Sequence, residues 1–137
     1  MTDDIVLSKK QSVERCVKQI RAYYARPSDQ PFAEDYFKQD AISANLQRVA
    51  ELCIDLANHV VRVKRLGLPK ESKESFELLE KAKIIEPYIA RQLSGMVSFR
   101  NIMVHEYQEL ELAILVDVIQ NHLDDVLTYI EQIMAAE

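Results

Sequence analysis

The chain has 137 residues, and nearly half of them are apolar, which suits one folded domain over residues 1–137 and argues against disorder. The formal net charge of −5 argues against a broad basic surface for nucleic acid but leaves room for a small basic pocket. Only two glycines and four prolines occur, so we expect few turns and long helices.

The first predicted helix runs from about Asp3 to Arg26, where apolar residues recur at helical spacing. A segment with two prolines, 27–31, ends it. An aromatic cluster follows in the connection, made of Phe32, Tyr36 and Phe37. Because aromatic side chains usually bury area, we interpret this cluster as lids on the core rather than a platform for stacked bases.

The second predicted helix, from Asp40 to Arg65, has the clearest pattern. Its apolar residues recur in steps of four and three, which is a heptad seam. The seam consists of Ile42, Leu46, Val49, Cys53, Leu56, Val60 and Val63. Gly67 and Pro69 follow in the order that usually terminates a helix.

Two further helices are predicted before the C-terminal one. A short helix from about Ser72 to Ala82 carries Phe76 and Leu79, with either Ser72 or Ser75 as its cap. The next helix begins near Pro87, a residue suited to a first turn. Its apolar face contains Ile89, Leu93, Met96, Phe99, Met103 and Val104.

The last predicted helix runs from about Glu109 to Ala135, and its seam consists of Leu112, Leu115, Ile119, Val126, Tyr129 and Ile133. No alternating strand pattern occurs along the sequence. The predicted fold class is therefore all-α, an antiparallel four-helix bundle with one short extra helix.

Cysteine usage and hydropathy suggest where the protein works. Cys16 and Cys53 are isolated thiols, which we interpret as reduced core residues of a cytosolic protein. The acidic N-terminus lacks a signal-peptide pattern, and no apolar run approaches the ~20 residues that a membrane span needs. We expect a cytoplasmic protein with no membrane association.

The segment from Arg100 to Tyr107 holds the residues best suited to chemistry. It combines Arg100, Asn101, His105 and Tyr107 in an otherwise apolar stretch. Arg100 falls inside the apolar stripe of its helix, where a cation needs a partner. That partner is either a core carboxylate, with the arginine at the edge of the bundle, or a bound phosphate, which guanidinium binds bidentately.

These residue types suit metal-free cleavage of RNA. A histidine can remove the proton of the 2′-hydroxyl or protonate the leaving oxygen, and an arginine can stabilise the charge on the phosphorane. Asn101 and Tyr107 can bind phosphate oxygens or orient the histidine. Arg100 and His105 lie about 140° apart on an ideal helix, so a two-fold dimer in which both copies line one cleft would bring them together more easily.

Residues Gly95 to Tyr107 resemble the signature of the HepT-like (DUF86) proteins of the HEPN superfamily. The Arg-Asn pair, the histidine and the spaced tyrosine match at each fixed position. The resemblance extends over the second helix, the short helix around Phe76 and the terminal amphipathic helix, whereas the first ~30 residues match least well.

This resemblance implies a metal-independent ribonuclease toxin of a toxin–antitoxin pair, partnered by a minimal nucleotidyltransferase (MNT) antitoxin. It implies that Arg100, His105 and Asn101 are catalytic and that the antitoxin silences the toxin by adding AMP to Tyr107. It also implies a HEPN-like homodimer with a composite cleft, or a hetero-oligomer with the antitoxin. We expect no cofactor and no metal ion in the site.

Other polar groups are interpreted as structural. Glu51, Asp55 and His59 recur every four residues, which could suggest a metal site, but a solvated helix face held by charge pairs is the simpler interpretation. His122 falls on the last seam, so we interpret it as a core or interface histidine.

Two other hypotheses compete with the nuclease. One is a non-catalytic HEPN helical module that binds a nucleotidyltransferase partner, with the motif serving only for docking or nucleotide contact. The other is a plain structural four-helix dimer, which leaves Arg100 in its apolar stripe unexplained.

Overall fold

The computed structural model describes residues 3–105 and 112–137, and the side chains of 104 and 105 fall outside that description. The helices are α1 (Asp4–Ala25), a 3-10 turn η1 (Phe32–Glu34), α2 (Tyr36–Val63), α3 (Ser72–Lys81), α4 (Pro87–His105), α5 (Leu112–Asp117), a π-helical segment η3 (Val118–His122) and α6 (Leu123–Ala135).

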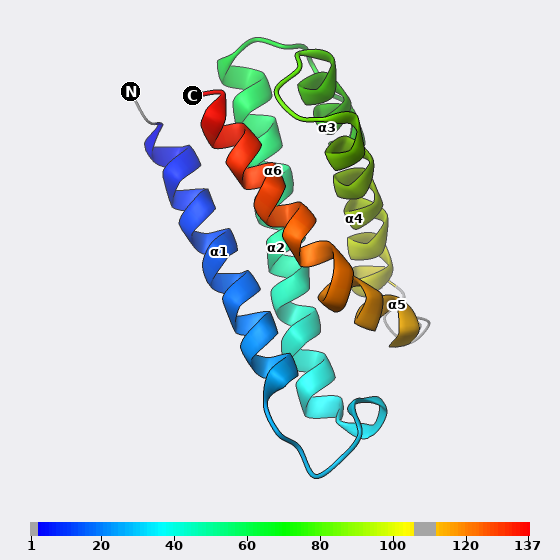
Figure 1. The fold of residues 1–137 in the computed structure, drawn as a ribbon. Helices are drawn as coiled ribbons and strands as arrows, with labels where there is room; N and C mark the ends of the chain where they lie inside the picture. Colours follow the sequence, from blue (N-terminus) through cyan, green and yellow to red (C-terminus); the bar gives the residue numbers. More distant parts are fainter. Residues whose placement is uncertain (1–2, 106–111) are drawn as a thin grey trace.

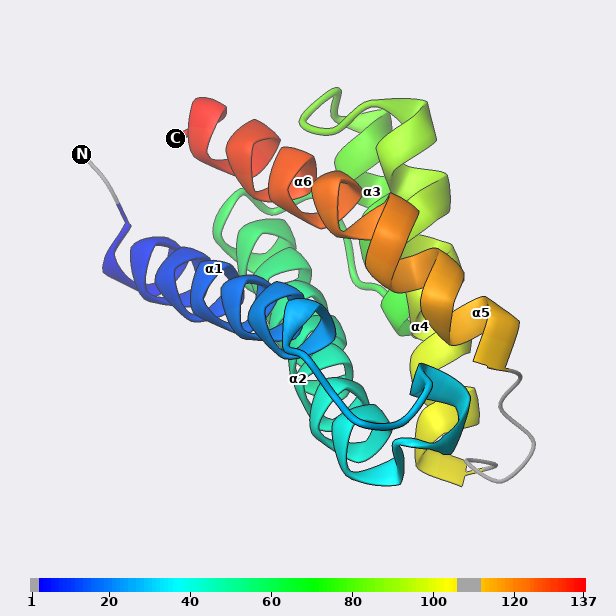
Figure 2. The same cartoon turned by 60° about the horizontal axis from the view of Figure 1, so that its bottom comes forward.

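Successive long helices run in opposite directions, and both chain termini lie at one end of the bundle (Figure 1). The start of α2 and the end of α4 lie toward the opposite end, as a second view also shows (Figure 2). This arrangement confirms the predicted all-α antiparallel four-helix bundle with a short extra helix. No strand occurs in the described parts of the chain.

Capping groups explain where two of the long helices begin. The Asp3 carboxylate accepts the backbone N–H groups of Ile5 and Val6, which starts α1 as predicted. Helix α2 begins at Tyr36 rather than near Asp40, because the Asp35 carboxylate accepts the Lys38 N–H at 3.0 Å. A good cap therefore extends this helix before its apolar seam begins.

The cap predicted for the short helix is wrong. Glu71 precedes α3 without a side-chain capping bond. Ser75 is fully buried and donates to the Asn58 side chain on α2, so it ties two helices together. Phe76 and Leu79 are buried, as the sequence pattern predicted.

The end of α2 and the following loop are more exposed than predicted. Helix α2 ends at Val63, whose side chain is 57% exposed although the heptad pattern placed it on the seam. Arg65 then adopts a φ of 55° and Gly67 a φ of 149°, which turns the chain away from the helix. Val63 is thus the last residue of the helix and lies outside the core.

The aromatic cluster after α1 is only partly a lid. Phe32 packs edge-on against Tyr24, with their ring centroids 5.3 Å apart. Tyr36 and Phe37 are instead 70% and 84% exposed, so the prediction that they cover the core is wrong. They lie in the first turn of α2, which extends beyond the core.

The last helix contains a π-helical turn that its sequence pattern did not reveal. Residues Val118–His122 form η3 between α5 and α6. Such a turn inserts extra backbone into the helix and shifts the register of the residues after it. Leu123 is consequently buried, whereas the side chain of His122, predicted to lie on the seam, is 31% exposed.

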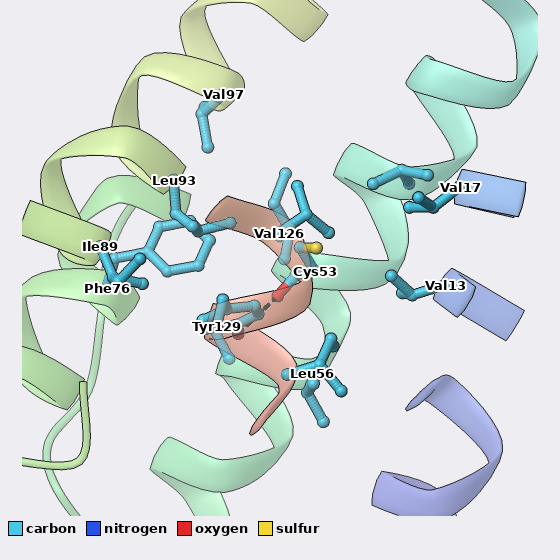
Figure 3. Close-up of a cluster of buried hydrophobic side chains, with 14 of the residues drawn as sticks. Val13, Val17, Cys53, Leu56, Phe76, Ile89, Leu93, Val97, Val126 and Tyr129 are labelled. Atoms are coloured by element: carbon cyan, nitrogen blue, oxygen red, sulfur yellow. Dashed lines mark hydrogen bonds between the residues drawn. The ribbon is translucent and has the colours of Figure 1, made fainter. Parts of the chain in front are cut away.

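The core lies between α1, α2, α4 and α6 and includes α3. The Phe76 ring meets the Tyr129 ring edge-on, and the Tyr129 hydroxyl donates to the Cys53 backbone oxygen at 3.0 Å (Figure 3). Cys16 and Cys53 are buried free thiols, and burial raises the pKa of Cys53. These contacts fix α2 at the centre of the bundle, from where it supports α4.

In the described parts of the chain, no helix has both the length and the apolar character that crossing a membrane requires.

Candidate functional site

Helix α4 carries Arg100, Asn101 and His105, three of the four residues that the sequence analysis singled out. It starts at Pro87 and continues as a helix through His105. Arg100 is partly buried and Asn101 is exposed. The side chain of His105 lies outside the described residues, as does Tyr107. The structure therefore fixes two of the four predicted site residues in full and His105 by its backbone.

Arg100 has a protein partner on the central helix. Its Nη1 group contacts a carboxylate oxygen of Glu51 on α2 at 2.9 Å, and the two side chains are 23% and 46% exposed. Of the two partners predicted for Arg100, the carboxylate is the one found in the isolated chain, and this carboxylate, Glu51, is itself half-exposed. Binding of a substrate phosphate by Arg100 stays a prediction.

The guanidinium of Arg100 retains capacity for a ligand. Its Nε atom is buried and has no hydrogen-bond partner. Arginine has several N–H donors in a planar fork, and the contact with Glu51 uses one of them. An anion approaching the exposed part of this side chain can therefore bind without first removing Glu51.

The opposite side of α4 carries a second group of polar residues. Ser98 and Asn101 lie on the side of α4 turned away from Arg100, and the backbone of His105 follows Ser98 by seven residues. On an ideal helix, residues seven apart differ by only about 20°, whereas Arg100 and His105 differ by about 140°. One straight helix consequently presents Arg100 and the His105 position to different surroundings.

A lysine from α3 reaches this second group. Lys73 Nζ donates to the Ser98 hydroxyl at 2.7 Å, and the Lys73 side chain is only partly buried. Sequence reasoning missed Lys73 because α3 seemed to offer only core residues. A signal was available in the next helix: α4 contains no aspartate or glutamate, although the whole chain has a net charge of −5. A helix without acidic residues is a surface beside which a lysine from a neighbouring helix can lie without an ion pair.

The acidic and histidine residues of α2 do not form a shared site. Glu51 pairs with Arg100, and Asp55 pairs with Lys9 at 3.6 Å. His59 is 7% exposed and contacts Asp3 through Nε2 at 2.6 Å, so its assignment to a solvated face is wrong. Within residues 3–105 and 112–137, no cluster of three or more potential ligands is arranged to hold a metal ion.

His122 lies between two carboxylates at the π-helical turn. Its ring nitrogens contact Asp125 at 2.9 Å and Asp117 at 3.0 Å. The hydrogen bond to Asp125 is the largest cause of a raised His122 pKa, and burial opposes it. The ring lines a cavity of about 190 Å³ between α4 and the last helix, together with Gln92 and Met96. The prediction of a core histidine is therefore wrong, because His122 is a partly exposed ion-pair group, and its alternative, an interface histidine, stays a prediction.

Comparison with known proteins adds sequence relatives. A family model described as Ribonuclease HepT-like matches residues 13–133. An mRNA nuclease HepT from Shewanella oneidensis is 43% identical over 133 residues, covering 97% of this chain and 98% of that protein. A tRNA nuclease HepT from Aphanizomenon flos-aquae is 30% identical over 82 residues, covering 57% of this chain and 56% of that protein.

Solved structures with the same architecture include toxins bound to their antitoxins. The tri-AMPylated HEPN toxin of Shewanella oneidensis in complex with MNT antitoxin has a TM-score of 0.91 at 43% identity, covering 99% of this chain and 100% of that chain. A toxin–antitoxin complex with AMP-PNP also has a TM-score of 0.91, at 42% identity, covering 98% of this chain and 100% of that chain.

Proposed function

The chain belongs to the HepT-like ribonuclease family, and on that premise we propose that it is an endoribonuclease toxin held inactive by a nucleotidyltransferase antitoxin. The observation that carries the proposal is 43% identity to an mRNA nuclease over almost the whole length of both proteins. The Arg-Asn-x3-His-x-Tyr arrangement in the sequence from Arg100 to Tyr107 adds chemical support.

The proposed reaction is an internal transfer within RNA. His105 takes the proton of a 2′-hydroxyl, the resulting oxygen attacks the adjacent phosphorus, and the bond to the 5′-oxygen breaks. The leaving oxygen receives a proton, which leaves a 2′,3′-cyclic phosphate and a free 5′-hydroxyl. Arg100 stabilises the negative charge on the phosphorane, and Asn101 donates to a phosphate oxygen. No step in this sequence needs a metal ion.

A homodimer can bring Arg100 and His105 together, which a single copy of the chain does not do easily. Within one copy, Arg100 points toward Glu51 on α2, and the His105 position lies about 140° around α4. Two copies related by a two-fold axis can place the arginine of one beside the histidine of the other. We therefore propose a composite site where the C-terminal ends of two α4 helices meet, which leaves the earlier turns of α4 free.

Tyr107 is the proposed site of silencing. Its phenol oxygen attacks the α-phosphorus of ATP in a reaction catalysed by the antitoxin, pyrophosphate leaves, and the phenol loses its proton. The attached AMP adds bulk and negative charge close to the catalytic groups, which excludes an RNA phosphate. The related toxin from Shewanella oneidensis is tri-AMPylated, which supports this class of modification.

One observation favours a second function, the non-catalytic module that binds a nucleotidyltransferase. Arg100 already has a carboxylate partner, so its presence in the apolar stripe does not by itself require RNA. In that case the motif would contact the partner or its nucleotide, and the isolated protein would not cut RNA.

The decisive experiment measures RNA cleavage by purified protein in EDTA, comparing wild type with His105→Ala and Arg100→Ala. We expect cleavage with cyclic-phosphate ends in the wild type and a loss of at least about 100-fold in both variants. His122→Ala removes a histidine distant in sequence from the motif and serves as the matched control. Cleavage retained in His105→Ala, or absent from wild type across several RNAs, would refute the proposal.

The silencing step is tested by mass spectrometry after incubation with the cognate nucleotidyltransferase and ATP. We expect one or more AMP units on the wild type and none on Tyr107→Phe. Tyr88→Phe removes a half-exposed tyrosine elsewhere on α4 and should accept AMP normally. A mass gain that persists in Tyr107→Phe would place the modification elsewhere.

A further inference from the structure

We propose that the RNA strand lies along the side of α4 turned away from Glu51, with Lys73 and Arg91 binding its phosphates. This polar side of α4 consists of Arg91, Ser94, Gly95, Ser98, Asn101 and the His105 position. The inference rests on the proposed nuclease function and adds the path of the substrate outside the catalytic groups.

Helical register aligns the cations with the catalytic position. Arg91, Ser98 and His105 follow one another at intervals of seven residues. Each step turns about 20° short of two full turns, so the three positions form a nearly straight row along the helix. Each step also advances about 10.5 Å, so a strand cut at His105 passes Ser98 and then Arg91.

Lys73 supplies charge at the middle of this row. Its ammonium donates to the neutral hydroxyl of Ser98 at 2.7 Å and, among the described residues, forms no ion pair. An ammonium has more than one N–H donor, so the contact with Ser98 leaves capacity for a phosphate oxygen. The nearby Glu74 carboxylate instead accepts the backbone N–H of Lys70 at 2.9 Å.

The surface of α4 is suited to a polyanion even though the protein is acidic. The helix contains no aspartate or glutamate over its whole length, and Arg91 on this side is exposed. Gly95 is also exposed, and a Cβ atom built there would meet nothing within 4 Å. Gly95 also lines a cavity with Asp117 and Asp125, whose carboxylates both contact the His122 ring. A nucleic-acid backbone that follows the row from Ser98 to Arg91 can approach the helix closely at Gly95, as in grooves that follow single strands.

Lys73 has a simpler possible role, which is to tie α3 to α4 through Ser98. The two roles predict different results. Loss of a structural tie lowers thermal stability and leaves the salt dependence of RNA binding unchanged. Loss of a phosphate contact weakens RNA affinity and makes that affinity less dependent on salt.

The test measures binding to a 2′-O-methyl RNA, which lacks the attacking hydroxyl and cannot be cut by the proposed reaction. Lys73→Gln and Arg91→Gln are each expected to weaken binding about three- to fivefold. Each should also reduce the slope of log affinity against log salt by ~0.7. Lys81→Gln makes the same charge change in the last turn of α3 and is expected to keep wild-type affinity.

Cleavage of ordinary RNA separates the possible outcomes. Lys73→Gln and Arg91→Gln should raise KM more than they lower kcat, and Lys73→Arg should restore KM. If the wild type cuts RNA but both glutamine variants match Lys81→Gln, the strand path is wrong and the nuclease function stands. If the wild type neither binds nor cuts RNA, the nuclease proposal itself fails.

A last control concerns assembly. Light scattering should give the same oligomeric state for the wild type, Lys73→Gln and Arg91→Gln. If either variant dissociates and loses RNA binding only through that dissociation, the polar side of α4 is a protein interface and the proposed strand path is overturned.

Discussion

The two ends of the bundle differ in whether their buried polar side chains have hydrogen-bond partners. Toward the chain termini, the Tyr129 hydroxyl, the Ser75 hydroxyl and the His59 ring all have hydrogen-bond partners. Near the start of α2 and the end of α4, the buried atoms Ser43 Oγ, Asn45 Oδ1 and Arg100 Nε have none, and they are the only such side-chain atoms among the described residues.

This difference separates stability from function. Buried polar groups are normally paired, because leaving one unpaired costs free energy. The end near the termini follows that rule, so its side chains serve mainly to hold the fold. The opposite end departs from it at three atoms, one of which belongs to the proposed catalytic arginine, and such departures are common at functional sites.

The largest effect is expected at the end near the termini. Tyr129→Ala should lower the free energy of unfolding by about 3–5 kcal/mol, because it removes a fully buried ring that packs against Phe76. Tyr129→Phe should cost only about 1 kcal/mol, the value of its hydrogen bond. Chemical denaturation measures both. Equal losses would contradict the view that packing dominates here.

The next effect concerns Arg100 at the opposite end, where the loss should be in activity and not in stability. Arg100→Gln should lower kcat by about 100- to 1,000-fold if the guanidinium stabilises the phosphorane. The free energy of unfolding should change by less than ~1 kcal/mol, because the pair with Glu51 is partly exposed. A large loss in the free energy of unfolding together with an unchanged kcat would contradict this assignment of Arg100 to activity.

The same substitution at both ends compares them directly. Ser75→Ala should destabilise by about 0.5–1.5 kcal/mol, because it removes the hydrogen bond that ties α3 to the Asn58 side chain on α2. Ser43→Ala should be neutral or slightly stabilising, because it removes a buried hydroxyl that has no partner. Thermal unfolding of the two variants tests this. Similar losses at the two positions would show that the ends do not differ.

The smallest expected effect is a pH dependence at the π-helical turn. Contacts with Asp125 and Asp117 raise the His122 pKa above its usual 6.5. Protonated His122 therefore stabilises the fold fully below about pH 6.5, and this contribution is lost as pH rises through the raised pKa.

Between pH 6 and pH 9, the Tm of the wild type should consequently fall further than that of His122→Gln. Tyr88, which contacts Asp125, has a raised pKa and does not titrate in this range. Parallel profiles of Tm against pH for the two proteins would show that His122 does not contribute to the pH dependence of stability.

Much of the fold was predictable because helix periodicity is a local property. The steps of the α2 seam from Ile42 to Val60 match the buried residues, and Asp3, Pro87 and Gly67 mark helix ends as predicted. On the seams of α2 and the last helix, the exceptions are Val63, which is the last residue of α2, and His122, which lies in an inserted π turn.

The sequence by itself determined the helical class and the motif from Arg100 to Tyr107, because side-chain types at fixed spacing along the chain need no tertiary information. Only the tertiary structure decided that Glu51 pairs with Arg100, that His59 is buried against Asp3, and that Lys73 reaches Ser98. These partners lie 49, 56 and 25 residues apart. Their meeting depends on which helices are neighbours and in what register they pack, and no local pattern encodes either.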